Sequence, residues 1–169
     1  MINNKIAVLF SIFMMLITAA SVYSQQGIPE TESLKGLGGI GVMIDDIDPV
    51  AVKDGLDADQ LKSSVTEGLR NGGIKILDPT EMKSTSGQPR IVVYINTIKH
   101  SGGVYSFTVS VSLDQIVLLE RNQQIKEIVP TWSVLGTGAS LPEDLNEDIN
   151  VYVKQLVGQF VKDYKQVNK

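Results

Sequence analysis

A run of aspartates in the first third of the chain is the densest group of side chains that could do chemistry. Six aspartates fall between residues 45 and 59, and Asp45, Asp46 and Asp48 lie within four residues of one another. Carboxylate oxygens are ligands that divalent cations prefer, so a metal site is one interpretation. The spacing does not match an EF-hand calcium loop, and Asp57 is placed to cap a helix. A solvated acidic loop is the other interpretation.

Two further motifs argue against the common kinds of catalytic or cofactor site. His100 is the single histidine and lies in a predicted turn, and the chain has no cysteine and no G-x-S-x-G nucleophile elbow. Residues 36–41 have the glycine spacing of a dinucleotide fingerprint, but a strand follows them where that motif needs a helix. We therefore expect no cofactor and a non-catalytic protein. An exported enzyme that uses Asp45, Asp46 and Asp48 with a metal stays open as an alternative.

Hydroxyl and amide side chains alternate with apolar ones over residues 91–98 and 104–113, which predicts two strands joined by a turn at residues 99–103. We place Ile98 opposite Val104, a register that makes one face of the pair wholly apolar. The other face is polar and poor in charge, so it could contact a glycan, an extended peptide or a second copy of the chain. Ordinary solvated surface is the alternative. The candidate binding residues are Tyr94, Asn96, Ser106, Thr108, Ser110 and Ser112.

A third strand is predicted to extend this pair into a meander. After a turn at residues 121–124, Trp132 falls opposite Leu113 and joins the apolar face. Gly136 and Gly138 lie further along the same face, where a missing side chain lets a helix or an aromatic ring approach closely. A small ligand in the gap between these glycines and the last helix is a further hypothesis for function.

Apolar residues at helical spacing predict two helices that cover the apolar face of the meander. The first begins at Asp57, which can cap it, and ends at Gly72–Gly73. The second is the longest element of the chain. It begins with a capping-box pair formed by Ser140 and Glu143 and carries an apolar stripe as far as Tyr164.

The remaining elements complete a single predicted domain over residues 37–169. A glycine-rich strand is expected over residues 40–44, a short strand over residues 74–77 and a loop over residues 79–90. The expected fold class is α+β. It is a two-layer sandwich with a mixed sheet of about five strands, the order β-α-β-β-β-β-α, and the long C-terminal helix packed on one face.

Residues 1–24 have the layout of a secretory signal peptide, with a basic start, an uncharged run over residues 6–23 and small side chains before a predicted cleavage between Ser24 and Gln25. An uncleaved membrane anchor is the alternative, because the uncharged run approaches the length of a spanning helix. The polar residues 25–36 are predicted to form a flexible leader.

Composition narrows the compartment and the partners. The net charge is −4, and the predicted signal peptide contains one lysine and no acid, so its removal leaves −5. An acidic surface repels phosphate backbones, which argues against nucleic acid as a partner. The absence of cysteine excludes disulfides and the thiol that a bacterial lipoprotein needs. We expect a soluble periplasmic or secreted protein with no integral membrane segment after cleavage.

The order of these elements resembles that of small bacterial envelope domains of the TolB N-terminal and curli-secretion type. The similarity rests on Gly41–Ile44, on the helix over Leu61–Leu69, on the strand Gly73–Leu77, and on the meander that contains Tyr105–Phe107, followed by a closing helix. It implies a non-catalytic accessory or binding role in the cell envelope, and it assigns no functional residue. We therefore expect an exported envelope domain that binds another protein or itself; the partner and the oligomeric state stay open.

Overall fold

The computed structural model describes residues 30–169, so the predicted signal peptide, its cleavage site and the first part of the leader lie outside the described residues. The elements are η2 (Glu30–Leu34), β1 (Gly41–Ile44), α2 (Pro49–Lys53), α3 (Ala58–Asn71), α4 (Pro79–Ser84), β2 (Arg90–Lys99), β3 (Tyr105–Leu119), β4 (Asn122–Ser140) and α5 (Leu145–Val167). The strands form a mixed sheet in the order β1-β2-β3-β4. β1 is parallel to β2, and the other neighbouring strands are antiparallel.

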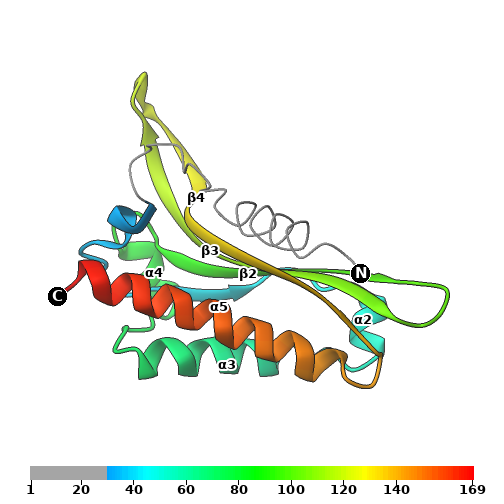
Figure 1. The fold of residues 1–169 in the computed structure, drawn as a ribbon. Helices are drawn as coiled ribbons and strands as arrows, with labels where there is room; N and C mark the ends of the chain where they lie inside the picture. Colours follow the sequence, from blue (N-terminus) through cyan, green and yellow to red (C-terminus); the bar gives the residue numbers. More distant parts are fainter. Residues whose placement is uncertain (1–29) are drawn as a thin grey trace, which may run out of the picture.

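The predicted α+β sandwich is confirmed, with the long C-terminal helix α5 packed beside α3 against one face of the sheet (Figure 1). The apolar stripes predicted from helical spacing are the buried ones. In α3 they are Leu61, Val65 and Leu69, and in α5 they include Ile149, Val153 and Phe160. The opposing side of the core comes from one face of β2 and β3, including Ile91, Val93, Val109, Val111 and Leu113.

The sheet of the described residues has four strands where about five were expected. The predicted strand over residues 74–77 makes a single parallel bridge, between Ile76 and Ile40, and extends no further. The Asp78 side chain accepts hydrogen bonds from Thr80 N and Glu81 N and so caps α4, with Pro79 in the first turn. A chain that turns into a helix here cannot continue to pair with β1, so the strand position beside β1 is filled at one residue only.

Two short helices replace segments expected to be loops. The loop predicted over residues 79–90 is wrong at its start, where α4 begins with a complete capping box between Asp78 and Glu81. The acidic loop after β1 leads into α2, whose N-cap is Asp48, with Pro49 in the first turn. Both helices are too short to show a helical apolar period, so only the capping aspartate and the following proline indicate them in the sequence.

The hairpin of β2 and β3 has the predicted faces but not the predicted register. Val93 pairs with Val111 and Ile98 with Ser106, which is a shift of two residues from the expected pairing of Ile98 with Val104. The turn keeps its length but moves by one residue to residues 100–104, where His100 N donates to Val104 O. Because side chains alternate with a period of two, a two-residue shift leaves every side chain on its predicted face.

The pairing of β4 with β3 brings Trp132 opposite Leu113, as predicted. The turn is nonetheless shorter than expected, since β3 ends at Leu119 and β4 begins at Asn122. Register shifts between Leu113 and Asp114 and between Leu118 and Leu119 supply the missing offset. Beyond Asp114, β3 has no pairing with β2, and the hairpin projects from the sheet as a two-stranded arm (Figure 1).

Two predicted boundaries at the ends of the domain are wrong. The leader predicted over residues 25–36 contains the helical turn η2, and Leu34 is completely buried, with its carbonyl accepting from Asn168 Nδ2. The capping box predicted for Ser140 and Glu143 does not form. Ser140 is the last residue of β4, its hydroxyl donates to Asp148 Oδ2 at 2.6 Å, and α5 begins at Leu145.

Candidate binding surface

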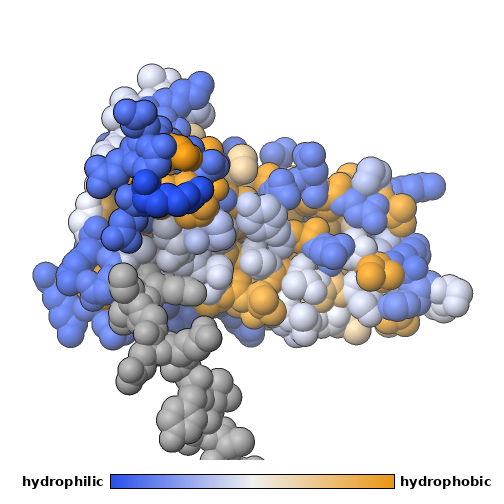
Figure 2. Space-filling view, turned by 90° about the horizontal axis from the view of Figure 1, so that it is seen from above, coloured by the Kyte–Doolittle hydropathy of each residue, from blue (hydrophilic) through white to orange (hydrophobic). Residues whose placement is uncertain are grey.

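The face of the sheet opposite α3 and α5 carries the side chains predicted for binding. Figure 2 looks down on this open face, where apolar side chains lie among polar ones. The face arises because even-numbered residues of β2 and β3 alternate with the core residues, and the register with β4 adds Leu135 opposite Ser110 and Thr137 opposite Thr108. The structure therefore places all six predicted residues on one surface.

The six residues do not share one environment. Ser112 is buried, and its hydroxyl donates to Asp114 Oδ1 at 2.7 Å. The Tyr94 hydroxyl donates to Asp114 Oδ2 at 3.3 Å. Partial burial, followed by the negative charge of Asp114, raises the pKa of Tyr94 above 10.0, so the phenol stays protonated as a donor. Ser112 thus acts within the sheet, and Tyr94 is 40% exposed and presents its ring to solvent.

The other end of the open face is a shallow hollow of about 330 Å³ lined in part by Asn96, Ser106 and Thr108. Ile98, which is 59% exposed, lies on its wall. The His100 Nε2 lies 2.8 Å from Ser106 Oγ. His100 is exposed in the hairpin turn, and no hydrogen bond from a residue in the range 30–169 orients its other ring nitrogen, so this pair lacks the third member of a hydrolytic triad.

Exposed apolar side chains on this face were missed at the level of sequence. Leu135 is 68% exposed, the largest exposed fraction among the large hydrophobic residues of the described chain, and Met43, in β1 at the opposite edge of the sheet, is 41% exposed. The signal was present, because the same register that puts Val134 on the core side must put Leu135 on the open side. The open face is therefore more apolar than the hydroxyl row alone indicates.

The structure does not bring the three aspartates of the predicted metal site together. Asp48 accepts from Val50 N at 2.8 Å as the cap of α2, and Asp45 continues from β1, with its amide donating to Val93 O. Within residues 30–169, no three His, Asp or Glu side chains are grouped so that they could hold a metal ion. Asp45, Asp46 and Asp48 therefore do not form the predicted cluster of ligands.

The gap predicted beside Gly136 and Gly138 is filled by aromatic side chains. A Cβ at Gly138 would lie 2.5 Å from Phe107 Cζ, and one at Gly136 would lie 2.8 Å from Tyr152 Cδ1. The two rings meet edge to face, with centroids 5.1 Å apart. The close approach of rings to these glycines is confirmed, and it leaves no space there for the proposed small ligand.

Comparisons with known proteins match the chain to solved structures of bacterial proteins at low identity and low TM-score. No family model and no curated protein matches the chain. A point variant of PelC from Paraburkholderia phytofirmans, solved as a dodecamer, is 14% identical, with a TM-score of 0.42 over 71% of this chain and 85% of that one. The unmodified PelC dodecamer is 15% identical, with a TM-score of 0.36 over 74% and 88% of the two chains. A minor lipoprotein from Acinetobacter baumannii is 10% identical, with a TM-score of 0.32 over 78% and 94%.

Similarity at this level transfers no residue role to the present chain, and the resemblance to TolB-type and curli-secretion domains stays a prediction. None of the helices formed by residues 30–169 is long and apolar enough to cross a membrane.

Proposed function

We propose that this chain is an exported, non-catalytic assembly module of the bacterial cell envelope, which associates with further copies of itself through the outer edge of β4 and the adjoining open face. The signal-peptide pattern of residues 1–24 supports export. The observation that carries the proposal is the half of β4 from Trp132 to Ser140. It contains no charged residue and no proline, and its outer edge has no partner strand within the described residues.

Natural proteins usually protect a long edge strand with charges, proline, bulges or a covering segment. The first half of β4 has such devices, since it carries Lys126, Glu127 and Pro130 and a register shift next to Thr131. The second half has no charge, no proline and no register shift, and Leu135 stands in its middle. An edge without these devices and with an exposed leucine is the structure expected of a strand that pairs with another chain.

A second copy fits this edge because the strand is compatible with itself. Antiparallel pairing about a two-fold axis at Leu135 sets Ser133 opposite Thr137 of the second copy, and every pair from residue 132 to residue 138 is uncharged. No like charges meet. The same pairing joins the two open faces into one continuous surface, on which the two copies of Leu135 are direct cross-strand neighbours.

The test is the molar mass of residues 25–169 in solution, measured by size-exclusion chromatography with light scattering. We expect an oligomer for the wild-type chain and a monomer for Leu135→Lys, because a lysine in the middle of an edge strand opposes pairing. Val151→Lys is the matched control, since Val151 is 45% exposed on α5 and lies in the helix layer. Oligomers that survive Leu135→Lys and dissociate in Val151→Lys would move the interface to the helices.

A further inference from the structure

A second feature of the fold is the pocket at the other edge of the sheet, beside β1. Ile40 pairs with the segment around Ile76 through two hydrogen bonds, Ile40 N to Lys75 O and Leu77 N to Ile40 O, and then the segment turns away into α4. The space next to the following residues of β1 forms a pocket of about 300 Å³. This volume is at the lower end of the range for small-molecule sites.

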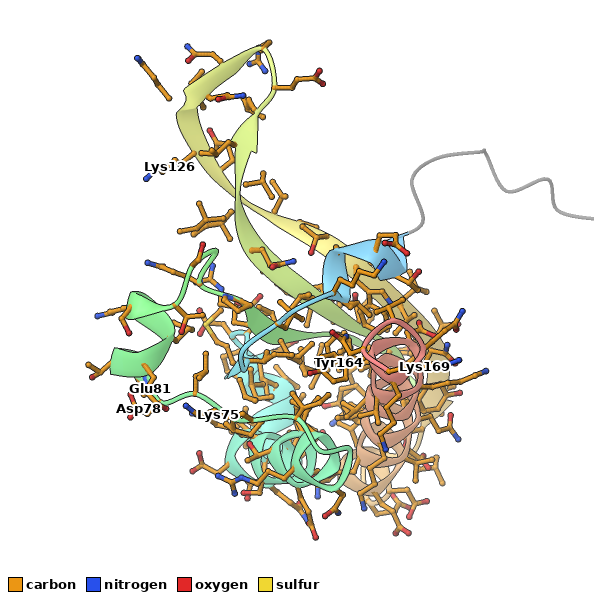
Figure 3. All side chains as sticks on the ribbon, turned by 90° about the vertical axis from the view of Figure 1, so that its left-hand side faces the viewer. Lys75, Asp78, Glu81, Lys126, Tyr164 and Lys169 are labelled. Atoms are coloured by element: carbon orange, nitrogen blue, oxygen red, sulfur yellow. The ribbon has the colours of Figure 1, made fainter. Side chains whose placement is uncertain are left out.

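The wall formed by α4 is held in place by polar contacts outside the pocket. Lys75 forms an ion pair with Glu81 at 2.8 Å, and Glu81 Oε2 also accepts from the amide of Asp78 (Figure 3). On the inner side, Met82 lies over Gly41, where a Cβ would stand 2.6 Å from its sulfur. The missing side chain of Gly41 is thus what lets α4 close the pocket from one side.

The lining is largely apolar and includes two basic side chains. Val42, Met43, Ile76, Leu77 and Met82 supply apolar surface, and Lys62 of α3 and Arg90 of β2 line the same pocket. Neither basic side chain forms an ion pair with a described residue. The pocket therefore combines an apolar interior with two basic side chains that have no ion-pair partner within residues 30–169.

Arg90 carries the most specific signal. Its Nε is buried and has no hydrogen-bond partner within residues 30–169. Asp114 is its cross-strand neighbour and accepts from Ser112 and Tyr94, and no hydrogen bond or ion pair joins it to Arg90 within residues 30–169. A buried donor without a partner is unfavourable, and a planar carboxylate is the group that a guanidinium binds best through paired hydrogen bonds.

We infer that the pocket lined by Arg90, Lys62 and Met82 binds a small amphipathic carboxylate, with its apolar body in the pocket and its head group on Arg90. The positive charges exclude a cationic ligand, and the apolar lining disfavours a fully polar anion. Lys62 is exposed, so it contributes attraction through solvent and Arg90 contributes the directed bond. This site is separate from the β4 edge and does not depend on the function proposed for it.

The experiment is a titration of the ¹⁵N-labelled mature chain with sodium octanoate, followed by amide chemical shifts. We expect saturable shifts at Gly41, Thr66 and Leu77, with Gly102 in the β2–β3 turn unaffected. 1-Octanol, which has the same apolar body without the charge, should bind at least about tenfold more weakly, as expected for loss of a charge-assisted hydrogen bond.

Variants separate the head-group contact from the apolar contact. Arg90→Met should weaken octanoate by at least about tenfold and leave 1-octanol nearly unchanged, whereas Lys83→Met, a charge removal in α4 outside the pocket lining, should change neither. Arg90→Lys, which keeps the charge and lacks Nε, should stay weaker than wild type, and a melting curve checks that each variant is folded. Equal binding of octanoate and 1-octanol to the wild-type chain, or shifts confined to the open face, would overturn the inference. If octanoate caused no shifts and an extended peptide shifted the amides of β1, the inference of carboxylate binding would be wrong, and the edge of β1 would bind a peptide strand instead.

Discussion

Gly138→Ala tests whether the aromatic packing between β4 and α5 is as tight as the structure shows. The new Cβ would lie 2.5 Å from Phe107 Cζ, 2.9 Å from Phe107 Cε2 and 3.0 Å from Tyr152 Oη. Real Cβ atoms do not approach this closely, so a ring must move. Phe107 is 3% exposed and has little room, because Tyr152 stands edge-on against it.

The expected cost follows from two opposing effects. Overpacking of a core typically costs about 1–3 kcal/mol. Replacing glycine within a strand recovers up to about 1 kcal/mol, because alanine loses less backbone freedom on folding. The backbone of Gly138 is not in the left-handed region, so no strain is added there. We expect a net destabilisation of about 1–2 kcal/mol, which is about 3–6 °C in Tm for a domain of this size.

The assay is thermal and urea unfolding of Gly138→Ala beside Gly102→Ala, where a Cβ meets nothing within 4 Å and no loss is expected. Phe107→Leu removes the atom that clashes. The double variant Gly138→Ala/Phe107→Leu should therefore lose less unfolding free energy than the two single variants together, by a coupling energy of about 1 kcal/mol. A Gly138→Ala chain as stable as wild type, or strictly additive costs, would refute the packing argument.

Three further predictions concern separate parts of the molecule. The hydrogen bond from Lys99, reinforced by that from Tyr105, holds the pKa of Asp54 below 3.8. The ionised Asp54 therefore stabilises the fold fully above pH 3.8, and this stabilisation is lost as the pH falls through the lowered pKa. The difference in stability between wild type and Lys99→Met, measured by urea unfolding across pH, should shrink on acidification below about pH 4. A difference that grew on acidification would contradict this assignment. Asp57→Ala removes the acceptor for Asp59 N and Gln60 N at the start of α3 and should cost about 1 kcal/mol in the free energy of unfolding; a cost near zero would show that the cap is not used. Replacing residues 117–127 of the arm by Asn-Gly should change the stability of the isolated domain by less than about 1 kcal/mol, because the two arm strands pair with each other and not with β2; cooperative unfolding at much lower temperature would show that the arm supports the core.

The faces of the sheet could be predicted from sequence because alternation tolerates an error of two residues. The sequence predicts Ile98 opposite Val104, and it pairs with Ser106, but its side chain still lies on the predicted open face of the sheet. The pairing of Trp132 with Leu113 was predicted with a wrong turn, since register shifts in β4 made up the difference. The hydrophobic pattern thus specifies which face of the sheet a side chain lies on more strongly than it specifies the length and position of the turns.

What could not be predicted was governed by single polar contacts. Ser140 has the pattern of a helix cap, but its hydroxyl bonds to Asp148 from the end of a strand. Asp78 and Glu81 did form a capping box, in a helix too short to show an apolar period. Leu34 lies in a polar stretch and is buried because the end of α5 passes beside it. Such contacts depend on which segments meet in space.

For the proposed binding surface, sequence identified the hydroxyl row but not the exposed apolar side chains on the same face. The even-numbered residues from Tyr94 to Ser112 lie on the face where alternation puts them, but alternation does not show that Ser112 is buried and bonded to Asp114. The predicted register of β4 already implies that Leu135 lies on the open face, because Val134 lies on the core side. The pocket beside β1 depends on where the chain leaves the sheet after Ile76, which apolar spacing does not encode.

The most direct test of the central claim is the solution molar mass of residues 25–169 as a function of concentration, for wild type and Leu135→Lys together. Association through the β4 edge predicts a wild-type mass that is a multiple of the chain mass and a Leu135→Lys mass equal to one chain, with unchanged circular dichroism. A wild-type chain that remains monomeric at its highest soluble concentration would contradict the account.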